Sequence, residues 1–72
     1  MFVKVRYYKS YGWYSGPEYC YETSLNLDVG DCVIAPTKNE ARQRAIVTAI
    51  KVHAPAFPCR EITEYDPDGR VF

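Results

Sequence analysis

The stretch Ala45–Val52, AIVTAIKV, decides the fold class, because its assignment as strand or helix determines whether the chain is all-β. It is apolar on both of its alternating sides and rich in Ala, Val and Ile, as in a central strand covered on both faces. A helix is the alternative for so short an apolar run. Its β-branched residues disfavour that helix, and no capping residue with an acidic partner precedes it. We therefore predict a central strand.

Alternating segments on either side of this strand predict the rest of a sheet, since a period of two is typical of half-buried strands. We predict five short strands at Met1–Tyr8, Glu18–Thr23, Cys32–Pro36, Ala45–Val52 and Arg60–Tyr65. Lys9–Pro17, which carries two Gly and one Pro, is expected to leave the sheet as a long hairpin loop. Thr37–Gln43 is the only stretch suited to a helical turn, and it is too short for a stable helix. This pattern predicts an all-β fold, a small five-stranded open barrel of the SH3-like or OB-like kind.

The length and charge of the chain limit what it does. A chain of 72 residues supports one hydrophobic core, so we predict a single domain over residues 1–72. Nine Lys and Arg balance nine Asp and Glu, so no overall field draws the protein to nucleic acid or to an anionic membrane. No apolar run approaches the length that crosses a bilayer, and the first residues lack the charged start, apolar core and cleavage site typical of a signal peptide. We expect an unprocessed cytoplasmic protein that does not bind membranes.

Residues able to carry chemistry are few. Cys20, Cys32 and Cys59 are odd in number and widely spaced, which predicts free thiols rather than a disulfide framework. With His53 as the only other good ligand, a zinc site is not expected. No nucleophile motif and no phosphate-binding loop occurs, and we take the acidic residues near the last turn as a solvated rim. The sequence therefore predicts no enzymatic activity, no cofactor and no small-molecule substrate.

Aromatic residues provide the first binding signal, with one Trp, seven Tyr and three Phe in the chain. Tyr7, Tyr19 and Tyr21 stand at the alternate positions of their predicted strands that face the interior, which favours packing in the core. Tyr11, Trp13 and Tyr14 lie in the Gly- and Ser-rich loop, a composition typical of binding loops. They either stack on the bases of a single strand, or contact a protein, or fold back as a lid on the barrel.

Segregated charge is the second binding signal. Basic residues cluster in two stretches: Lys4, Arg6 and Lys9, and then Lys38, Arg42, Arg44 and Lys51. As neighbours in a barrel, these stretches form a basic track for a phosphate backbone, although an ordinary mixed surface is the alternative. Residues 18–31 and 61–68 are acidic, which favours a different partner, a basic groove on another protein.

From Tyr19 to Val52 the chain resembles the N-terminal 3′-end DNA-binding domain of the primosomal helicase PriA. The resemblance lies in the Tyr-Cys-Tyr triplet at 19–21, the LNLDVGDCVIAP stretch, a polar tip and the returning AIVTAIKV strand. It implies a small β-barrel that recognises a single-stranded 3′ end, with Tyr19 and Tyr21 at the pocket aromatics. Cys20 stands where that family has an acidic residue, and Lys38 where it usually has glycine. The chain also resembles small phage-encoded SH3-like barrel proteins.

Two functional hypotheses follow from these signals, and both are binding functions. The first is a single-stranded nucleic-acid-binding, DNA-binding module that uses Tyr11, Trp13 and Tyr14 for stacking and Lys4, Arg6, Lys38, Arg42 and Arg44 for phosphates. The resemblance adds Tyr19 and Tyr21 to its binding site. The second is a phage protein for protein-protein interaction, an anti-CRISPR-like inhibitor of a host nucleic-acid-acting enzyme or defence system. Assembly of a homo-oligomer through exposed aromatics and strand edges is a third reading.

Overall fold

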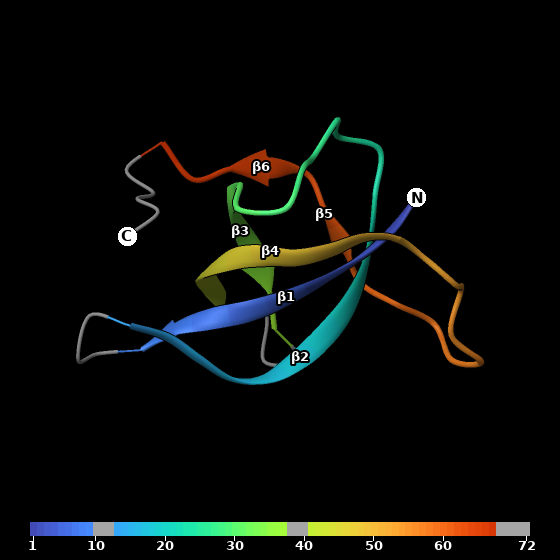
Figure 1. Ribbon diagram of the computed structural model, residues 1–72, viewed down its shortest axis with the longest axis horizontal. Coiled ribbons are helices and arrows are strands. Elements are labelled where there is room, and N and C mark those ends of the chain that lie inside the picture. Colours follow the sequence, from blue (N-terminus) through green and yellow to red (C-terminus); the bar gives the residue numbers. More distant parts are fainter. Residues whose placement is uncertain (10–12, 38–40, 68–72) are drawn as a thin grey trace.

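The computed structural model describes residues 1–9, 13–37 and 41–67, and these ranges contain strands and no helix. The strands are β1 (Phe2–Lys9), β2 (Trp13–Thr23), β3 (Cys32–Pro36), β4 (Arg42–Val52), β5 (Glu61–Ile62) and β6 (Glu64–Tyr65). They form one sheet in the order β5-β2-β1-β4-β3-β6 (Figure 1). The prediction of an all-β protein is confirmed, and none of the described residues lies in a helix able to span a membrane.

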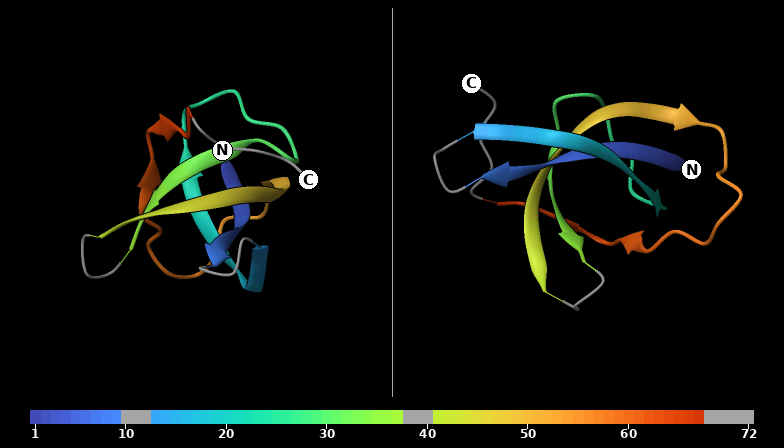
Figure 2. Two further views of the ribbon diagram at one scale, coloured as in Figure 1. Left: turned by 90° about the vertical axis from the view of Figure 1, so that its left-hand side faces the viewer. Right: turned by 90° about the horizontal axis from the view of Figure 1, so that it is seen from below.

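The sheet is open, and its two edge strands follow one another in the chain. β5 runs parallel to β2 at one edge, whereas β6 runs antiparallel to β3 at the other, and only Thr63 separates them. The sheet therefore curls until both edges lie along the same short segment (Figure 2). The sheet has six strands rather than the predicted five, because the predicted strand Arg60–Tyr65 is divided at Thr63 between two partners.

The core lies inside this curl and explains the alternation of the sequence. Val3 and Val5 of β1 are fully buried, whereas the intervening Lys4 and the following Arg6 are exposed. The buried apolar residues are Val3, Val5, Tyr21, Leu27, Val33, Ala35, Ala45, Val47 and Ile62. The central strand β4 is buried on one face only, with Ile46 and Thr48 half-exposed on the other. The prediction that both of its faces are buried is wrong, because the outer face stays partly open to the solvent at Ile46 and Thr48.

The second strand begins earlier than predicted, at Trp13 rather than at Glu18. Val5 pairs with Tyr19 and Tyr7 with Ser15, so a single β1 residue opposes the three β2 residues 16–18. This bulge accommodates Gly16, with φ of 90°, and a proline that cannot donate a ladder hydrogen bond. The prediction that Lys9–Pro17 leaves the sheet is therefore wrong for Lys9 and for residues 13–17, whereas residues 10–12 lie outside the described residues.

β3 and β4 are antiparallel neighbours, and the pairing continues to Pro36 and Arg42. The Thr37 amide donates to the Ala41 carbonyl at 2.9 Å, and Arg42 and Gln43 already belong to β4. The described part of Thr37–Gln43 is therefore not helical, because pairing with β3 extends β4 beyond its predicted start, whereas residues 38–40 lie outside the described residues.

Candidate functional site

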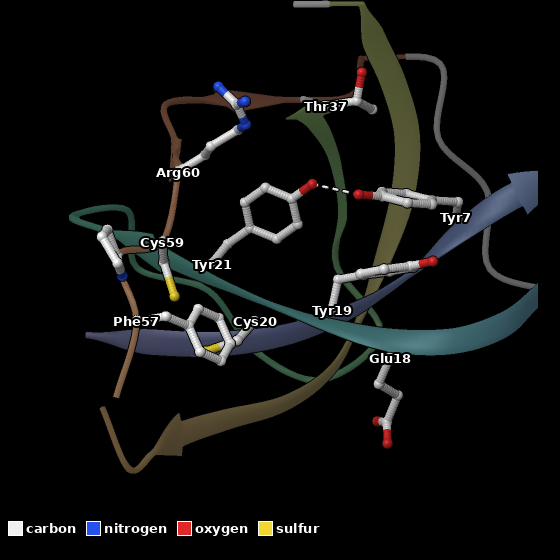
Figure 3. A pocket seen from close by; sticks show the side chains of 10 residues that line it. Tyr7, Glu18, Tyr19, Cys20, Tyr21, Thr37, Phe57, Cys59 and Arg60 are labelled. Atoms are coloured by element: carbon white, nitrogen blue, oxygen red, sulfur yellow. Dashed lines mark hydrogen bonds between the residues drawn. The ribbon is translucent and has the colours of Figure 1, made fainter. Parts of the chain in front are cut away.

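A cleft of about 630 Å³ opens beside β2, between that strand and the segment that leads from β4 to β5 (Figure 3). Its lining includes four aromatic side chains and two charged ones: Tyr7, Tyr19, Tyr21, Phe57, Glu18 and Arg60. We call this site the aromatic cleft. It lies at the edge of β2 that faces away from β1, where β5 pairs with β2 only at Glu22 and Thr23 and no described strand pairs with the preceding β2 residues.

Tyr19 and Tyr7 form a stacked pair in the cleft. Their ring centroids are 4.8 Å apart and the ring planes differ by 22°. Tyr19 is 43% exposed, so its ring is accessible from the solvent. The prediction that Tyr19 packs in the core is wrong, because Tyr19 precedes the part of β2 that pairs with β5, whereas Tyr21 is buried as predicted.

Tyr21 joins the cleft to the core. Its hydroxyl donates to the Pro36 carbonyl at 2.7 Å and also hydrogen-bonds to the Tyr7 hydroxyl. Burial raises the pKa of Tyr21 well above the ordinary value of a tyrosine. The neutral Tyr21 therefore ties β2 to the end of β3, and it holds the Tyr7 ring on which Tyr19 stacks.

The raised pKa of Tyr21 predicts a loss of stability in alkali. Above pH about 10 the unfolded chain loses a proton that the folded protein keeps, so the free energy of unfolding falls as the pH rises. Tyr21→Phe is expected to flatten this fall and to cost about 1 kcal/mol at pH 7, since Pro36 loses its donor. Urea unfolding between pH 7 and pH 11 measures both effects. Tyr65→Phe is the control, and equal alkaline slopes for the parent and Tyr21→Phe would contradict the assignment.

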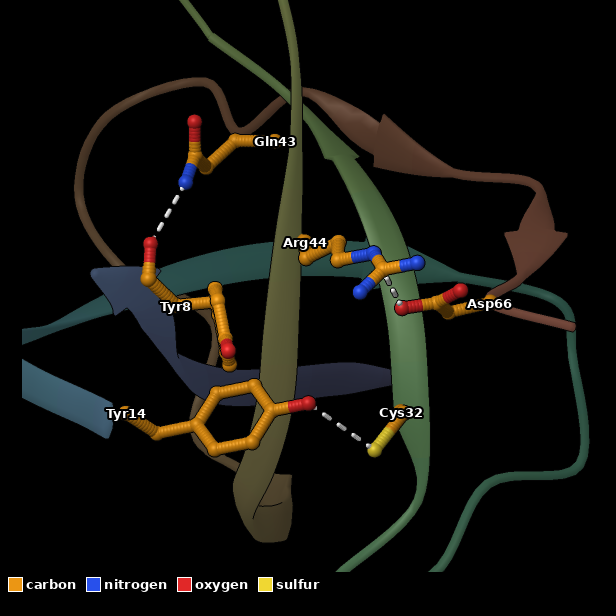
Figure 4. Close-up of polar contacts among 6 residues, drawn as sticks. All are labelled: Tyr8, Tyr14, Cys32, Gln43, Arg44 and Asp66. Atoms are coloured by element: carbon orange, nitrogen blue, oxygen red, sulfur yellow. Dashed lines mark hydrogen bonds and ion pairs between the residues drawn. The ribbon is translucent and has the colours of Figure 1, made fainter. Parts of the chain in front are cut away.

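A second aromatic group lies on the outer face of the sheet (Figure 4). Tyr8 and Tyr14 meet edge to face with ring centroids 5.1 Å apart, and the Arg44 guanidinium lies 6.0 Å from the Tyr8 ring centre. The Tyr14 hydroxyl lies 3.3 Å from the Cys32 sulfur, and Gln43 donates to the Tyr8 carbonyl at 2.7 Å. Tyr14 therefore packs on the sheet within β2 and does not belong to a separate binding loop.

The basic residues predicted to bind phosphates fall into two environments. Lys4 and Arg6 are exposed on β1, and β1 pairs with β4, so the two basic stretches are neighbours. On β4, however, Arg42 pairs with Glu64 at 2.7 Å and Arg44 with Asp66 at 3.3 Å. The acidic end of the described chain thus offsets the charge of β4, which leaves β1 as the more basic part of this surface.

The remaining predicted site residues are only partly placed. Tyr11 and Lys38 lie outside the described residues, and Trp13 is described only by its backbone at the start of β2. Conversely, Phe57 and Arg60 line the cleft without having been predicted. Phe57 lies before the predicted last strand and Arg60 is expected to begin it, and no local signal reveals that this part of the chain returns to β2.

Other chemistry has little support in the described ranges. No group of three or more His, Cys, Asp or Glu within them is arranged to hold a metal ion. His53 is exposed in a coil, and the three cysteines are free thiols. Comparison with protein-family models, curated proteins and solved structures finds no match to this chain. Function therefore has to be inferred from the aromatic cleft and its surroundings.

Proposed function

We propose that this chain is a non-enzymatic module that binds single-stranded nucleic acid, with one base held in the aromatic cleft. The observation that carries the proposal is the exposed Tyr19 ring, backed by the stacked Tyr7 ring. A base stacks on such a ring whatever its identity, and each stack contributes about 1–3 kcal/mol. The Tyr7 ring, held by Tyr21, keeps Tyr19 in position before the base arrives.

Cationic groups around the cleft suit a phosphate backbone. Arg60 lies in the cleft lining, and a guanidinium matches the geometry of a phosphate. Lys4 and Arg6 are exposed on β1, the strand beside β2. We propose a path that runs from the cleft across β1, rather than along Arg42 and Arg44, which face acidic partners.

The proposed fold is an open barrel of the SH3-like or OB-like kind, and the proposed location is the cytoplasm. The curl of the sheet, with both edges along one segment, supports the first. Free thiols at all three cysteines support the second. In OB folds, single strands bind on the barrel surface with the help of aromatic side chains, the role that we propose for Tyr19.

Fluorescence anisotropy of a labelled single strand of ~15 nucleotides tests the proposal. We expect binding that weakens with salt, and about 5- to 150-fold weaker binding for Tyr19→Ala. Tyr65→Ala is the matched control, because Tyr65 is 49% exposed on β6 and lies outside the cleft lining. Absence of binding at low salt, or equal losses in the two variants, would overturn the proposal.

The same titration, repeated at several salt concentrations, tests whether Arg60 contacts a phosphate. Arg60→Gln is expected to reduce the salt slope of log affinity by about one, as the loss of one phosphate contact does. Arg42→Gln is the control, since Arg42 already pairs with Glu64 and is expected to leave the slope unchanged.

A protein partner is the second candidate, in the form of a phage-encoded inhibitor of a host nucleic-acid-acting enzyme or defence system. The observation that favours it is the pairing of only two of the 11 residues of β2 with β5. A strand of another protein adds readily to such an edge. This function predicts no binding of the labelled strand at any salt concentration, so the same titration separates the two candidates.

A further inference from the structure

Cys20 and Cys59 are far apart in the sequence and adjacent in the fold. β2 and β5 pair in parallel, Glu22 with Glu61 and Thr23 with Ile62, and the Glu22 amide donates to the Arg60 carbonyl at 3.0 Å. The same offset, continued two residues back along both segments, places Cys59 beside Cys20. Both residues line the aromatic cleft, and Figure 3 shows their sulfur atoms near each other.

The two cysteines also influence each other electrostatically. Cys20 is among the causes that raise the pKa of the Cys59 thiol, after burial, and both residues are only partly buried. Neighbouring strands lie about 4.8 Å apart, which falls within the Cα separation of about 4.4–6.8 Å that a disulfide bridges. A bond between the two sulfur atoms therefore requires little movement of the backbone.

We propose that Cys20 and Cys59 form a dithiol site that closes to a disulfide when it meets a small-molecule disulfide such as oxidised glutathione. One thiolate attacks a sulfur of the oxidant, forms a mixed disulfide and releases one thiol. The second thiolate then attacks the protein sulfur of that mixed disulfide and releases the other thiol. Two protein thiols are oxidised to one disulfide, and one small disulfide is reduced to two thiols.

The environment of Cys59 affects the pH at which the pair reacts. Burial, interaction with the Cys20 side chain and the negative charge of Glu22 raise the pKa of the Cys59 thiol. Because the thiolate is the nucleophile in disulfide exchange, the reaction is expected to be faster in mild alkali than at neutral pH. Cys32 takes no part, since it lies on β3 beside the Tyr14 hydroxyl.

A disulfide between Cys20 and Cys59 would link the two sides of the aromatic cleft covalently. Phe57, Cys59 and Arg60 belong to the segment between β4 and β5, whereas Cys20 belongs to β2. The dithiol chemistry needs no ligand and stands without the nucleic-acid proposal. Its effect on ligand release rests on that proposal: the oxidised protein is expected to release a bound strand more slowly, because the cleft opens less readily.

The test uses Cys32→Ser, which leaves the pair as the only cysteines. This variant is incubated with oxidised glutathione at pH 8 and examined by intact mass and by alkylation of its remaining thiols. We expect loss of both thiols, a mass lower by two hydrogen atoms and no retained glutathione. The melting temperature is expected to rise on the order of 10 °C and to return on reduction. Peptide mapping of the parent, which links residue 20 to residue 59, gives the same answer if Cys32→Ser fails to fold.

Single replacements of the pair provide the controls. In the Cys32→Ser background, Cys59→Ser is expected to accumulate one glutathione adduct at Cys20, because the resolving thiol is gone. Two adducts on Cys32→Ser, a disulfide-linked dimer, or two thiols that remain unreacted would each overturn the proposal. These readouts involve no nucleic acid, so failure of the dithiol site and failure of the proposed function are separate results.

Discussion

Replacing Ile62 with alanine is expected to remove about 2–5 kcal/mol from the free energy of unfolding, the range for large-to-small changes in a core. Ile62 is fully buried although it lies on a two-residue edge strand, and its carbonyl accepts a hydrogen bond from the Thr23 hydroxyl at 2.8 Å. Small domains have a total stability of only about 5–15 kcal/mol. The loss is therefore a large fraction of the stability expected for a domain of this size.

Chemical denaturation followed by circular dichroism measures this loss. Phe57→Ala is the control, because Phe57 precedes β5 in the same segment and is 62% exposed. Its replacement is expected to change stability by no more than about 0.5 kcal/mol. A cost below about 1 kcal/mol for Ile62→Ala would contradict the placement of β5 over the core.

Replacing Arg44 with alanine is expected to cost about 1–3 kcal/mol of stability, because it leaves a buried carboxylate without its cation. The Asp66 side chain is 2% exposed and lies 3.3 Å from the Arg44 guanidinium. The Asp66 amide also donates to the Cys32 carbonyl at 3.0 Å, which fastens this end of the described chain to β3. Both residues have further contacts, so the expected cost lies below that of isolating a buried charge.

Arg42 provides a matched comparison two residues earlier on β4. Its partner Glu64 and its own side chain are both more than half exposed, so Arg42→Ala is expected to change stability by no more than about 1 kcal/mol. Urea unfolding of the two variants under identical conditions tests the difference. Equal losses would show that burial of Asp66 does not distinguish the pairs, and that the structural role assigned to Arg44 is wrong.

The strands of this fold that the sequence predicts well are those whose alternation is local. Apolar residues at every second position, such as Val3, Val5 and Val47, predict β1, β3 and the second half of β4, and these residues are buried in the structure. The first half of β2 could not be predicted, because Gly16 and Pro17 are typical of turns. They fit into the strand only as a bulge in its pairing with β1, and that pairing joins residues that are distant in the sequence. Parallel pairing of β5 with β2 has no local signature at all.

The candidate site likewise has residues that the sequence points out and residues that only non-local pairing brings together. Tyr19 and Tyr21 stand out in the sequence as aromatics of one strand, yet only the structure distinguishes the exposed ring from the buried one. Phe57 and Arg60 could not be assigned, because their place in the cleft depends on the non-local pairing of β5. The adjacency of Cys20 and Cys59 depends on that pairing too, which is why three scattered cysteines carry no such signal in the sequence.

The two edge strands, separated only by Thr63, also determine when the protein is able to fold. A chain that has formed β1 to β4 but has not yet docked this segment lacks the last partner of both edges of its sheet. Such an intermediate displays two unpaired edges at once, and unpaired edges are sites of aggregation. Docking of one short segment covers both edges, so the rate of this single step determines how long an aggregation-prone intermediate lasts.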